Sequence, residues 1–537
     1  MISSKKHIAI IGLGLTGQSM LRFLYAQLGN ISRANSAITI TLCDSRFANE
    51  DPKSILEPSL RALADPGIAL VFATQEDSFP AECDLVLASP GIPHSHEWFQ
   101  AALAQGVMIS SDISLFLDAL QNSNTSRKRS RKPAPLVVGV TGSNGKSTVV
   151  SALGSALNHA GVSNLVLGNI GTPVLNALAS ISDTTVVILE LSSFQLDLMT
   201  ANSADSKLDI ACLLNVSQDH LDRYESFNDY RRSKLSIYNK AIAMVWNTLD
   251  LTTIPSSKNT AVASSFENKN DCLAHFMAED TEQAIGLSVS VKADADTNSF
   301  VSIIQERLGF SDQDEQTEAL KASAKSRQRS CPTMLKLAPL SASATWISNA
   351  CACLSIAALL NKTIDFDLAQ FTEGLREYTF LPHRYQRFKK AIRHNHTIEF
   401  IDDSKATNVG AAISAIDSAR QAFDFIVLIA GGLAKGAELS PLTDAIDEHV
   451  DVALLIGKSS SLLSSAILKA ESIQCEDLSE CLARFDGWLQ ARKVDDPENG
   501  VLLLSPACAS MDMFANYQDR GEKFQAAVQS YLQEAAA

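Results

Sequence analysis

The sequence predicts an α/β protein made of three domains, each with a parallel β-sheet covered by helices. Short apolar runs, among them 8–15 and 425–434, alternate with helix-like stretches, which is typical of strand–helix units. Turns rich in glycine, serine and proline follow several of these runs, as they do where a strand ends. The length of 537 residues allows roughly three to five domains of ~100–200 residues.

Composition excludes several classes of protein. Hydrophobic residues make up 46% and charged residues 20%, which favours packed cores over a disordered chain. The net charge of −15 argues against a nucleic-acid or anionic-membrane binder. No apolar run approaches the ~18 residues needed to span a bilayer. The ten cysteines form no CxxC pair, which argues against structural zinc or a disulfide framework. We therefore expect a soluble, cytoplasmic protein.

The first predicted domain covers residues 1–133. A strand, a glycine turn and a helix occupy 7–29, and further strands follow in 37–46 and 83–93. Lys5 and Lys6 before an apolar run imitate a signal peptide, but the glycines that interrupt this run favour a first β-strand. The polar, basic segment 121–136 is interpreted as a solvated linker.

The second predicted domain covers residues 134–380. Strands are expected in 136–140, 184–193, 210–217 and 244–247, and a helix-like stretch is expected in 224–243. Residues 255–335 are rich in polar side chains and are interpreted as an insertion with mobile loops and some strands, such as 299–304. A helix over 346–360 resumes the core.

The third predicted domain covers residues 381–537. Three apolar runs, 397–404, 425–432 and 500–507, are expected to be strands with helices between them. Polar residues follow each run, and side chains at strand ends line the crevice where α/β proteins bind ligands. Lys405, Thr407, Lys435 and Ser510 therefore indicate a site for an anionic small molecule that carries carboxylates.

The strongest local motif is Thr-Gly-Ser-Asn-Gly-Lys-Ser-Thr at 141–148, between a strand and a helix. Backbone N–H groups of such a turn bind phosphate, and the helix N-terminus adds partial positive charge. Lys146 is placed to reach the terminal phosphates and Ser147 to bind Mg²⁺. Because Val140 stands where the general motif has glycine, this is a variant phosphate loop.

Two residues at other strand ends extend this site. Glu190 ends one apolar run, and His220 follows another. A strand-end glutamate is often structural, and a single histidine is more often a packing residue than a ligand. Because phosphate loop, glutamate and histidine follow three strands of one domain, together they predict a site for Mg²⁺ and phosphoryl transfer.

The first domain carries a dinucleotide fingerprint. Gly12, Gly14 and Gly17 follow its first strand, and Asp44 ends the next. This spacing indicates that a diphosphate approaches the backbone closely, but it does not identify the nucleotide. Taken alone, it would indicate an NAD-dependent oxidoreductase.

Eleven motifs occur in one order along the chain: 11–19, 87–93, 141–148, 168–175, 190–197, 215–224, 230–238, 381–388, 402–408, 431–436 and 505–524. This combination resembles the Mur ligases, the ATP-dependent amide-forming enzymes of peptidoglycan precursor synthesis, and among them the members that add D-glutamate. The resemblance covers the chain outside 255–335. It implies a Rossmann-like UDP-binding domain, a central P-loop ATPase-like domain and a C-terminal Rossmann-like domain that binds the amino acid.

The resemblance also implies roles for residues. UDP would be held by Leu15, Thr16, Ser45, Arg46, Ser89, Gly91 and Asn169. ATP would be held by Gly142, Ser143, Asn144, Gly145, Lys146, Ser147, Thr148, Asn349, Arg384 and Asp403. D-Glutamate would be held by Thr407, Lys435, Ser510, Met511 and Tyr517. The catalytic residues would be Lys146, Glu190, His220, Lys234 and Lys405.

Metal binding is likewise implied by the resemblance. Two Mg²⁺ ions would be bound by Ser147, Glu190, His220 and Lys234, the last as a carbamate formed with CO₂. A carbamate is an oxygen donor with negative charge, which suits Mg²⁺. Without the resemblance, Lys234 would be interpreted as an ordinary lysine on a helix surface.

The implied function is a monomeric ligase that joins D-glutamate to UDP-N-acetylmuramoyl-L-alanine through an acyl phosphate, with no nucleic-acid or membrane partner. Trp346 departs from the family pattern and puts the adenine contacts in doubt. An NAD-dependent oxidoreductase and a non-catalytic, Mur-like UDP-sugar-binding protein stay open as alternatives.

Overall fold

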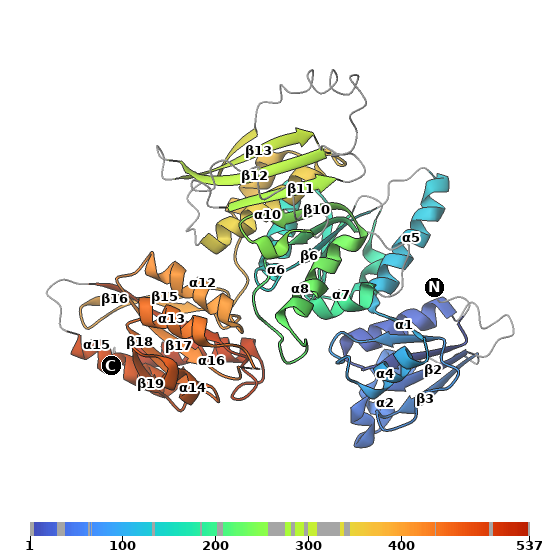
Figure 1. The fold of residues 1–537 in the computed structure, drawn as a ribbon, viewed down its shortest axis with the longest axis horizontal. Coiled ribbons are helices and arrows are strands. Elements are labelled where there is room, and N and C mark those ends of the chain that lie inside the picture. Colours follow the sequence, from blue (N-terminus) through green and yellow to red (C-terminus); the bar gives the residue numbers. More distant parts are fainter. Residues whose placement is uncertain are drawn as a thin grey trace. The chain divides into compact units, whose positions relative to one another are not determined.

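The computed structural model describes residues 5–28, 38–62, 65, 67–130, 135–182, 185–200, 208–255, 274–280, 285–294, 299–308, 333–337, 344–434, 436–492 and 498–534. The described strands form three sheets, whose elements are labelled in Figure 1. The chain divides into two compact units. One comprises 1–215, 231–340 and 348–377, and the other comprises 216–230, 341–347 and 378–537.

The first sheet is parallel, with the strand order β3-β2-β1-β4-β5 in the described residues. This order is typical of Rossmann-like folds, and it places the ends of β1 and β2 beside each other. Its strands are β1 (His7–Ile11), β2 (Ile38–Cys43), β3 (Ile68–Ala73), β4 (Leu85–Ala88) and β5 (Met108–Ser110). Its helices are α1 (Leu15–Leu28), α2 (Pro52–Ile55), α3 (Pro58–Arg61), α4 (Glu97–Ala104) and α5 (Asp112–Ser130).

Helix α5 corrects the prediction of a linker over 121–136. The helix continues to Ser130, so much of the predicted linker is helical. Arginine and lysine are good helix formers, and the first proline of the segment is Pro133, beyond the end of α5. A polar composition was therefore a poor indicator of loop structure in this segment.

The second sheet has the order β14-β13-β12-β11-β10-β9-β6-β8-β7 in the described residues. The strands from β10 to β7 pair in parallel, whereas β10 to β14 pair antiparallel. Its strands are β6 (Leu136–Thr141), β7 (Asn164–Gly168), β8 (Val186–Glu190), β9 (Leu208–Leu213), β10 (Ala241–Asn247), β11 (Ala274–Asp280), β12 (Ile285–Asp294), β13 (Ser299–Leu308) and β14 (Thr333–Leu337). Its helices are α6 (Lys146–His159), α7 (Ser193–Thr200), α8 (Phe227–Leu235), α10 (Ala344–Leu360) and α11 (Leu368–Arg376).

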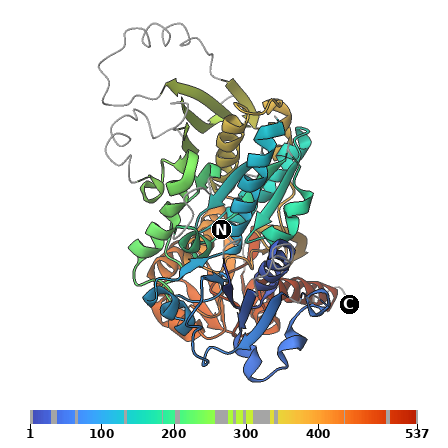
Figure 2. The same cartoon turned by 90° about the vertical axis from the view of Figure 1, so that its right-hand side faces the viewer.

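The segment predicted as an insertion contributes strands to this sheet. β11 to β14 continue antiparallel from β10, and the yellow-green strands of Figures 1 and 2 show this extension. The predicted strand 299–304 lies within β13. The most polar part, 311–330, lies outside the described residues. The helix-like stretch predicted for 224–243 is too long, because β10 begins at Ala241.

The third sheet has the order β15-β16-β20-β17-β18-β19 in the described residues. β15 pairs antiparallel with β16, and the other pairs are parallel. Its strands are β15 (Gln386–Arg393), β16 (His396–Asp402), β17 (Phe425–Gly431), β18 (Val452–Ile456), β19 (Glu471–Gln474) and β20 (Asn499–Ala507). Its helices are α12 (Val409–Arg420), α13 (Ser440–His449), α14 (Ser460–Ala466), α15 (Leu478–Ala491) and α16 (Tyr517–Glu534).

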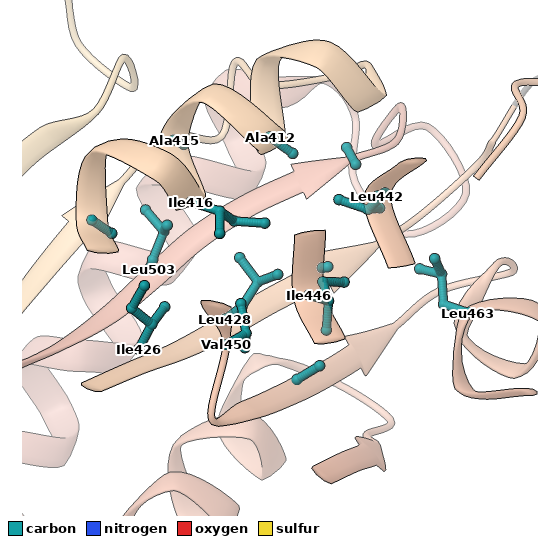
Figure 3. Close-up of a cluster of buried hydrophobic side chains, with 14 of the residues drawn as sticks. Ala412, Ala415, Ile416, Ile426, Leu428, Leu442, Ile446, Val450, Leu463 and Leu503 are labelled. Carbon is teal, nitrogen blue, oxygen red and sulfur yellow. The ribbon is translucent and has the colours of Figure 1, made fainter. Parts of the chain in front are cut away.

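Both faces of this sheet are buried, which explains why β17 is apolar along its whole length. Ile426 and Leu428 point to one face and pack with Ile416 of α12 and Ile446 of α13, as Figure 3 shows. Phe425 and the other alternate residues of β17 belong to the core on the opposite face. This packing fixes the carboxyl ends of the strands, where the polar residues lie.

None of the described helices is both long and apolar enough to cross a bilayer.

Candidate active site

The phosphate loop lies between β6 and α6, as predicted. Gly145 adopts the left-handed conformation, with φ 83°, and a Cβ there would lie 2.7 Å from Asn349 Oδ1 of α10. A side chain at this position would therefore clash with a predicted ATP-binding residue. Lys146 Nζ donates hydrogen bonds to the carbonyl oxygens of Gly142 (2.8 Å) and Ser143 (3.0 Å). The Lys146 ammonium group thus lies against the phosphate loop, where the ATP phosphates are expected to bind.

β6 lies between β8 and β9, so the ends of these three strands are neighbours. This arrangement places Glu190, the last residue of β8, beside the phosphate loop. The Glu190 side chain is 2% exposed, and its Oε1 accepts a hydrogen bond from Asn169 Nδ2 at 3.1 Å. Its Oε2 is buried without a hydrogen-bond partner in the described part of the chain. A buried carboxylate oxygen with no donor is the kind of group that a metal ion satisfies.

Two further residues of this site were expected from the resemblance. Asn169 was expected to contact the UDP-linked substrate, and the structure places its amide on Glu190. Asn349 is 6% exposed and lies against Gly145, within contact of the phosphate loop.

Lys234 corrects the interpretation as a surface lysine. The side chain is 1% exposed, although α8 is mostly polar. The neighbouring Ser233 donates a hydrogen bond from Oγ to the carbonyl of Ser193, at the start of α7, at 3.0 Å. This contact ties α8 to the start of α7 next to Lys234.

The glycine turn after β1 is shaped by Asp44. Asp44 Oδ2 accepts a hydrogen bond from Leu13 N–H at 2.8 Å, and Arg46 Nε and Nη2 donate to Oδ1 and Oδ2, both at 2.8 Å. Burial opposes ionisation of Asp44, but the hydrogen bonds from Arg46 and Leu13 outweigh it and lower the pKa to about 2. The ionised Asp44 side chain therefore holds the backbone of this turn in place.

Two of the three fingerprint glycines are required by close contacts. A Cβ on Gly17 would lie 2.0 Å from the Gly12 carbonyl oxygen, and Gly12 has φ +83°. A Cβ on Gly14 would meet nothing within 4 Å. Ser89 Oγ donates to the Gly12 carbonyl oxygen at 2.8 Å, and Leu15 is 71% exposed. The predicted UDP-binding residues Leu15, Thr16, Ser45, Arg46, Ser89 and Gly91 lie on the segments that follow β1, β2 and β4.

His220 lies in the segment 216–230, which belongs to the compact unit that contains the third sheet. The residue has φ 55°, and its N–H donates to Asp219 Oδ1 at 2.9 Å. Asp219 Oδ2 accepts a hydrogen bond from Asn408 Nδ2 at 3.1 Å, and Asn408 caps α12. These contacts fix the backbone at His220 within that unit.

The end of β16 carries a buried polar network that sequence analysis missed. Asp402 is fully buried, and its Oδ2 makes a hydrogen bond of 2.7 Å with His383 Nδ1 and accepts another from Gln525 Nε2. Arg520, also fully buried, donates to the Ser404 carbonyl oxygen at 2.8 Å. Because these partners come from distant segments, no local pattern could have indicated them.

The predicted residues Asp403 and Lys405 are held by this network. Asp403 accepts hydrogen bonds from Tyr385 N–H at 3.0 Å and from Ser505 Oγ at 2.9 Å. Burial raises the pKa of Asp403 to about 7, although the hydrogen bonds and nearby Arg384 oppose this rise. Lys405 N–H donates to the His383 carbonyl oxygen, and its Nζ lies 3.9 Å from the centre of the Tyr517 ring.

The remaining predicted D-glutamate residues lie near the ends of β16 and β20. Ser510 is buried, Thr407 is half-buried and Met511 is 73% exposed. Lys435 lies outside the described residues.

Trp346 lies in the first turn of α10 and is 3% exposed. Its ring stacks on Tyr378 at 5.5 Å and meets the edge of Phe380 at 4.9 Å. The residue that departs from the family pattern is thus packed in an aromatic cluster with Tyr378 and Phe380.

Within the part of the chain that the structure describes, no three His, Cys, Asp or Glu side chains gather as a metal cluster. This is compatible with Mg²⁺, which proteins commonly hold by one or two carboxylates together with substrate phosphates.

The sequence was compared with known proteins. The model "Mur ligase middle domain" matches residues 140–303, and "Mur ligase MurD-like, N-terminal domain" matches residues 6–111. The UDP-N-acetylmuramoylalanine–D-glutamate ligase of Saccharophagus degradans is 33% identical over 531 residues, which cover 98% of this chain and 97% of that protein. The ligase of the same name from Colwellia psychrerythraea is 32% identical over 539 residues, covering 98% and 97%.

This chain belongs to the Mur ligase family. The fold agrees, because the solved structure of the MurF ligase from Thermotoga maritima in complex with ADP superposes with a TM-score of 0.52. The two sequences are 15% identical, and the superposition covers 94% of this chain and 97% of that one. The three-domain α/β class predicted from the sequence is confirmed.

Family membership revises the predicted insertion. The middle-domain match continues to residue 303, so it includes β11, β12 and part of β13. The resemblance was expected to cover the chain outside 255–335, and this match extends into the first part of that segment. Antiparallel edge strands with polar composition look like loops in a sequence.

Proposed function

We propose that this chain joins D-glutamate to UDP-N-acetylmuramoyl-L-alanine in peptidoglycan precursor synthesis, with ATP converted to ADP and phosphate. The observation that carries the proposal is the match along 98% of the chain to ligases named for this reaction, with Lys146 at the start of the helix after β6 and Glu190 at the end of the adjacent β8. The reaction would take place in the cytoplasm, and we expect the chain to act as a monomer.

The reaction would proceed in two steps. The carboxylate of the alanyl end attacks the γ-phosphorus of ATP, which forms an acyl phosphate and releases ADP. The neutral amine of D-glutamate then attacks the acyl carbon, and phosphate leaves as the amide forms. In the first unit, Lys146 and the N–H groups at the N-terminus of α6 would meet the charge that develops on the phosphoryl oxygens.

The second unit would supply further groups to the same reaction. Arg384 and Asp403 would complete the ATP site, and Lys405 would stabilise negative charge on the transferred group. Thr407, Lys435, Ser510, Met511 and Tyr517 would hold D-glutamate by its two carboxylates and its stem. The contact of Lys405 with the Tyr517 ring supports this assignment, since it fixes a cation at the strand end where an anionic ligand is expected.

Mg²⁺ would be held by Glu190 and Ser147, which supply the hard oxygen donors that this ion prefers. The bound ion would neutralise phosphate charge. The Oε2 of Glu190, which is buried without a hydrogen-bond partner among the described residues, supports this assignment. A second ion, held with His220 and a carbamate of Lys234, completes the proposal. The burial of Lys234 supports a role for its nitrogen that a surface lysine would not have.

The carbamate has its own test. Lys234→Met keeps the length and the apolar stem of the side chain, so we expect a folded protein with little activity. Incubation of the wild-type chain with ¹³C-bicarbonate should give a carbamate signal that is missing in the variant. An active Lys234→Met variant, or no signal in the wild type, would contradict the carbamate.

Phosphate release tests the activity. With ATP, Mg²⁺ and UDP-N-acetylmuramoyl-L-alanine, we expect phosphate to be released with D-glutamate and not with L-glutamate, L-lysine or glycine. Lys146→Met should abolish this release without unfolding the chain. Absence of release with D-glutamate would overturn the proposed function.

The two alternatives make different predictions. An oxidoreductase would bind NAD(P)H tightly, which a nicotinamide fluorescence titration measures. The structure argues against it, because both oxygens of Asp44 are engaged by Arg46 and Leu13 in place of a ribose. A non-catalytic UDP-sugar-binding protein would bind the UDP-linked substrate but release no phosphate.

A further inference from the structure

Asn215 is an unassigned residue that contacts the phosphate loop through its side chain and its backbone. Its Oδ1 accepts a hydrogen bond from Asn144 N–H at 2.9 Å, and its Nδ2 donates to the Asn144 carbonyl oxygen at 3.1 Å. Its own carbonyl oxygen accepts a hydrogen bond from Ser143 N–H at 2.9 Å. One residue thus makes three hydrogen bonds with two consecutive residues of the loop.

The position of Asn215 follows from the sheet. β9 lies beside β6, and Leu214 N–H, directly after β9, donates to the carbonyl oxygen of Thr141. Asn215 is the next residue, so its side chain reaches the turn that leaves β6. A Cβ on Gly142 would lie 3.1 Å from Leu214 Cβ, which shows how closely these two segments approach.

These bonds decide which loop groups face a phosphate. The N–H groups of Ser143 and Asn144 both point at Asn215. The first-turn N–H groups of α6, at a helix N-terminus, are the donors that we expect to bind phosphate. The hydrogen bonds to Asn215 fix the conformation of the loop before the nucleotide binds. The N–H groups of α6 and Lys146 are then already in place, and binding does not have to order the loop.

We propose that Asn215 is a positioning residue that holds the phosphate loop in the conformation that binds the ATP phosphates. It acts through the loop and not by contact with the reacting atoms. The inference rests on the proposed use of ATP by this loop. An amide suits the role because its acceptor and its donor are separate atoms, so it can bind both the N–H and the carbonyl oxygen of Asn144, whereas an ionised carboxylate has no donor.

The test compares Asn215→Ala with a matched asparagine. Asn164 lies at the start of β7, and its Nδ2 donates to the carbonyl oxygen of Gly154 at 3.0 Å, within α6 but away from the loop. Both asparagines are half-buried and hold backbone of the same unit. Asn164→Ala therefore controls for a purely structural loss.

Calorimetric titration with Mg·ADP on the full chain gives the first measurement, and steady-state kinetics gives the second. Loss of two side-chain hydrogen bonds should raise the Kd for ADP and the KM for ATP roughly ten- to a hundredfold. The KM for the UDP-linked substrate should stay unchanged. Asn164→Ala should leave both nucleotide constants as in the wild type.

Asn215→Asp decides the matter where the alanine variant does not fold. It keeps the size and the acceptor for Asn144 N–H, but it loses the donor and adds negative charge, so ADP should again bind at least roughly tenfold more weakly. Wild-type ADP affinity in a folded Asn215 variant, or an equal loss in Asn164→Ala, would overturn the inference. A wild-type chain that binds ADP but releases no phosphate with D-glutamate would contradict only the proposed function.

Discussion

Gly521 of α16 is a helical glycine whose replacement should disturb the end of β16. A Cβ at this position would lie 2.2 Å from His383 Nδ1 and 2.8 Å from Asp402 Oδ2. Gly521→Ala would therefore push the His383 ring away from the carboxylate that holds it. Gly487 of α15 offers a matched control, because a Cβ there would meet nothing within 4 Å.

The magnitude follows from three contributions. Alanine is favoured over glycine inside a helix by about 0.5–1 kcal/mol. Loss of the hydrogen bond between His383 and Asp402 costs about 1.5–3 kcal/mol, because it involves a charged group. Accommodation of the added methyl group in packed surroundings costs about 1–3 kcal/mol. Gly521→Ala should thus destabilise the local structure by about 2–5 kcal/mol, whereas Gly487→Ala should stabilise it by about 0.5–1 kcal/mol.

Hydrogen exchange measured by mass spectrometry gives the local stability of α16 and β16 separately from that of the rest of the chain. Peptides from α16 and β16 should exchange roughly tens to thousands of times faster in Gly521→Ala, and peptides from the first sheet should not change. In a His383→Ala background the same substitution should cost much less, because the clashing ring is absent. Unchanged or slower exchange in Gly521→Ala, or an equal cost in both backgrounds, would refute this reasoning.

Three further predictions concern the turn after β1 and the end of β16. Gly17→Ala should unfold that turn, since its Cβ would lie 2.0 Å from the Gly12 carbonyl oxygen, whereas Gly14→Ala should keep the fold and raise only the KM for the UDP-linked substrate. Asp44→Ala should cost about 1–3 kcal/mol in urea unfolding at pH 7. That difference should disappear as pH falls through about 2, because the folded-state pKa of Asp44 is lowered to that value. Burial raises the pKa of Asp403 to about 7. The stability of the wild type should therefore fall relative to that of Asp403→Asn as pH rises from about 4 to about 7, and then level off. Melting curves of both proteins at about pH 5 and about pH 8 measure this difference.

Local sequence patterns predicted where several of the candidate ligand-binding residues lie on the sheets. The phosphate loop, Glu190 and Lys405 each follow an apolar run, and the ends of parallel strands are where α/β folds bind ligands. The pattern therefore predicted the residue type and its place on the sheet together.

The same patterns were insufficient for the residues that hold these groups in place. Asp402 binds both His383 and Gln525, the latter 123 positions away in the sequence, and Asn215 binds Asn144 across 71 positions. Such partners depend on strand order, and the order β9-β6-β8 is a property of the folded sheet. When the partner of a polar residue lies far away in the sequence, nothing in the local pattern identifies that residue as part of a site.

Lys234 illustrates a different limit. Periodicity assigns a residue to an exposed or a buried face of a helix by its apolar neighbours, and α8 has few of them. The Lys234 side chain is nevertheless buried, and the neighbouring Ser233 is bonded to the start of α7, a contact that no spacing in the sequence encodes. Burial of an ammonium group is costly unless the charge is compensated, so a protein that needed only packing here would be better served by an apolar side chain. A lysine held at 1% exposure is therefore a candidate for a chemical role at its nitrogen, which the ¹³C-bicarbonate experiment tests.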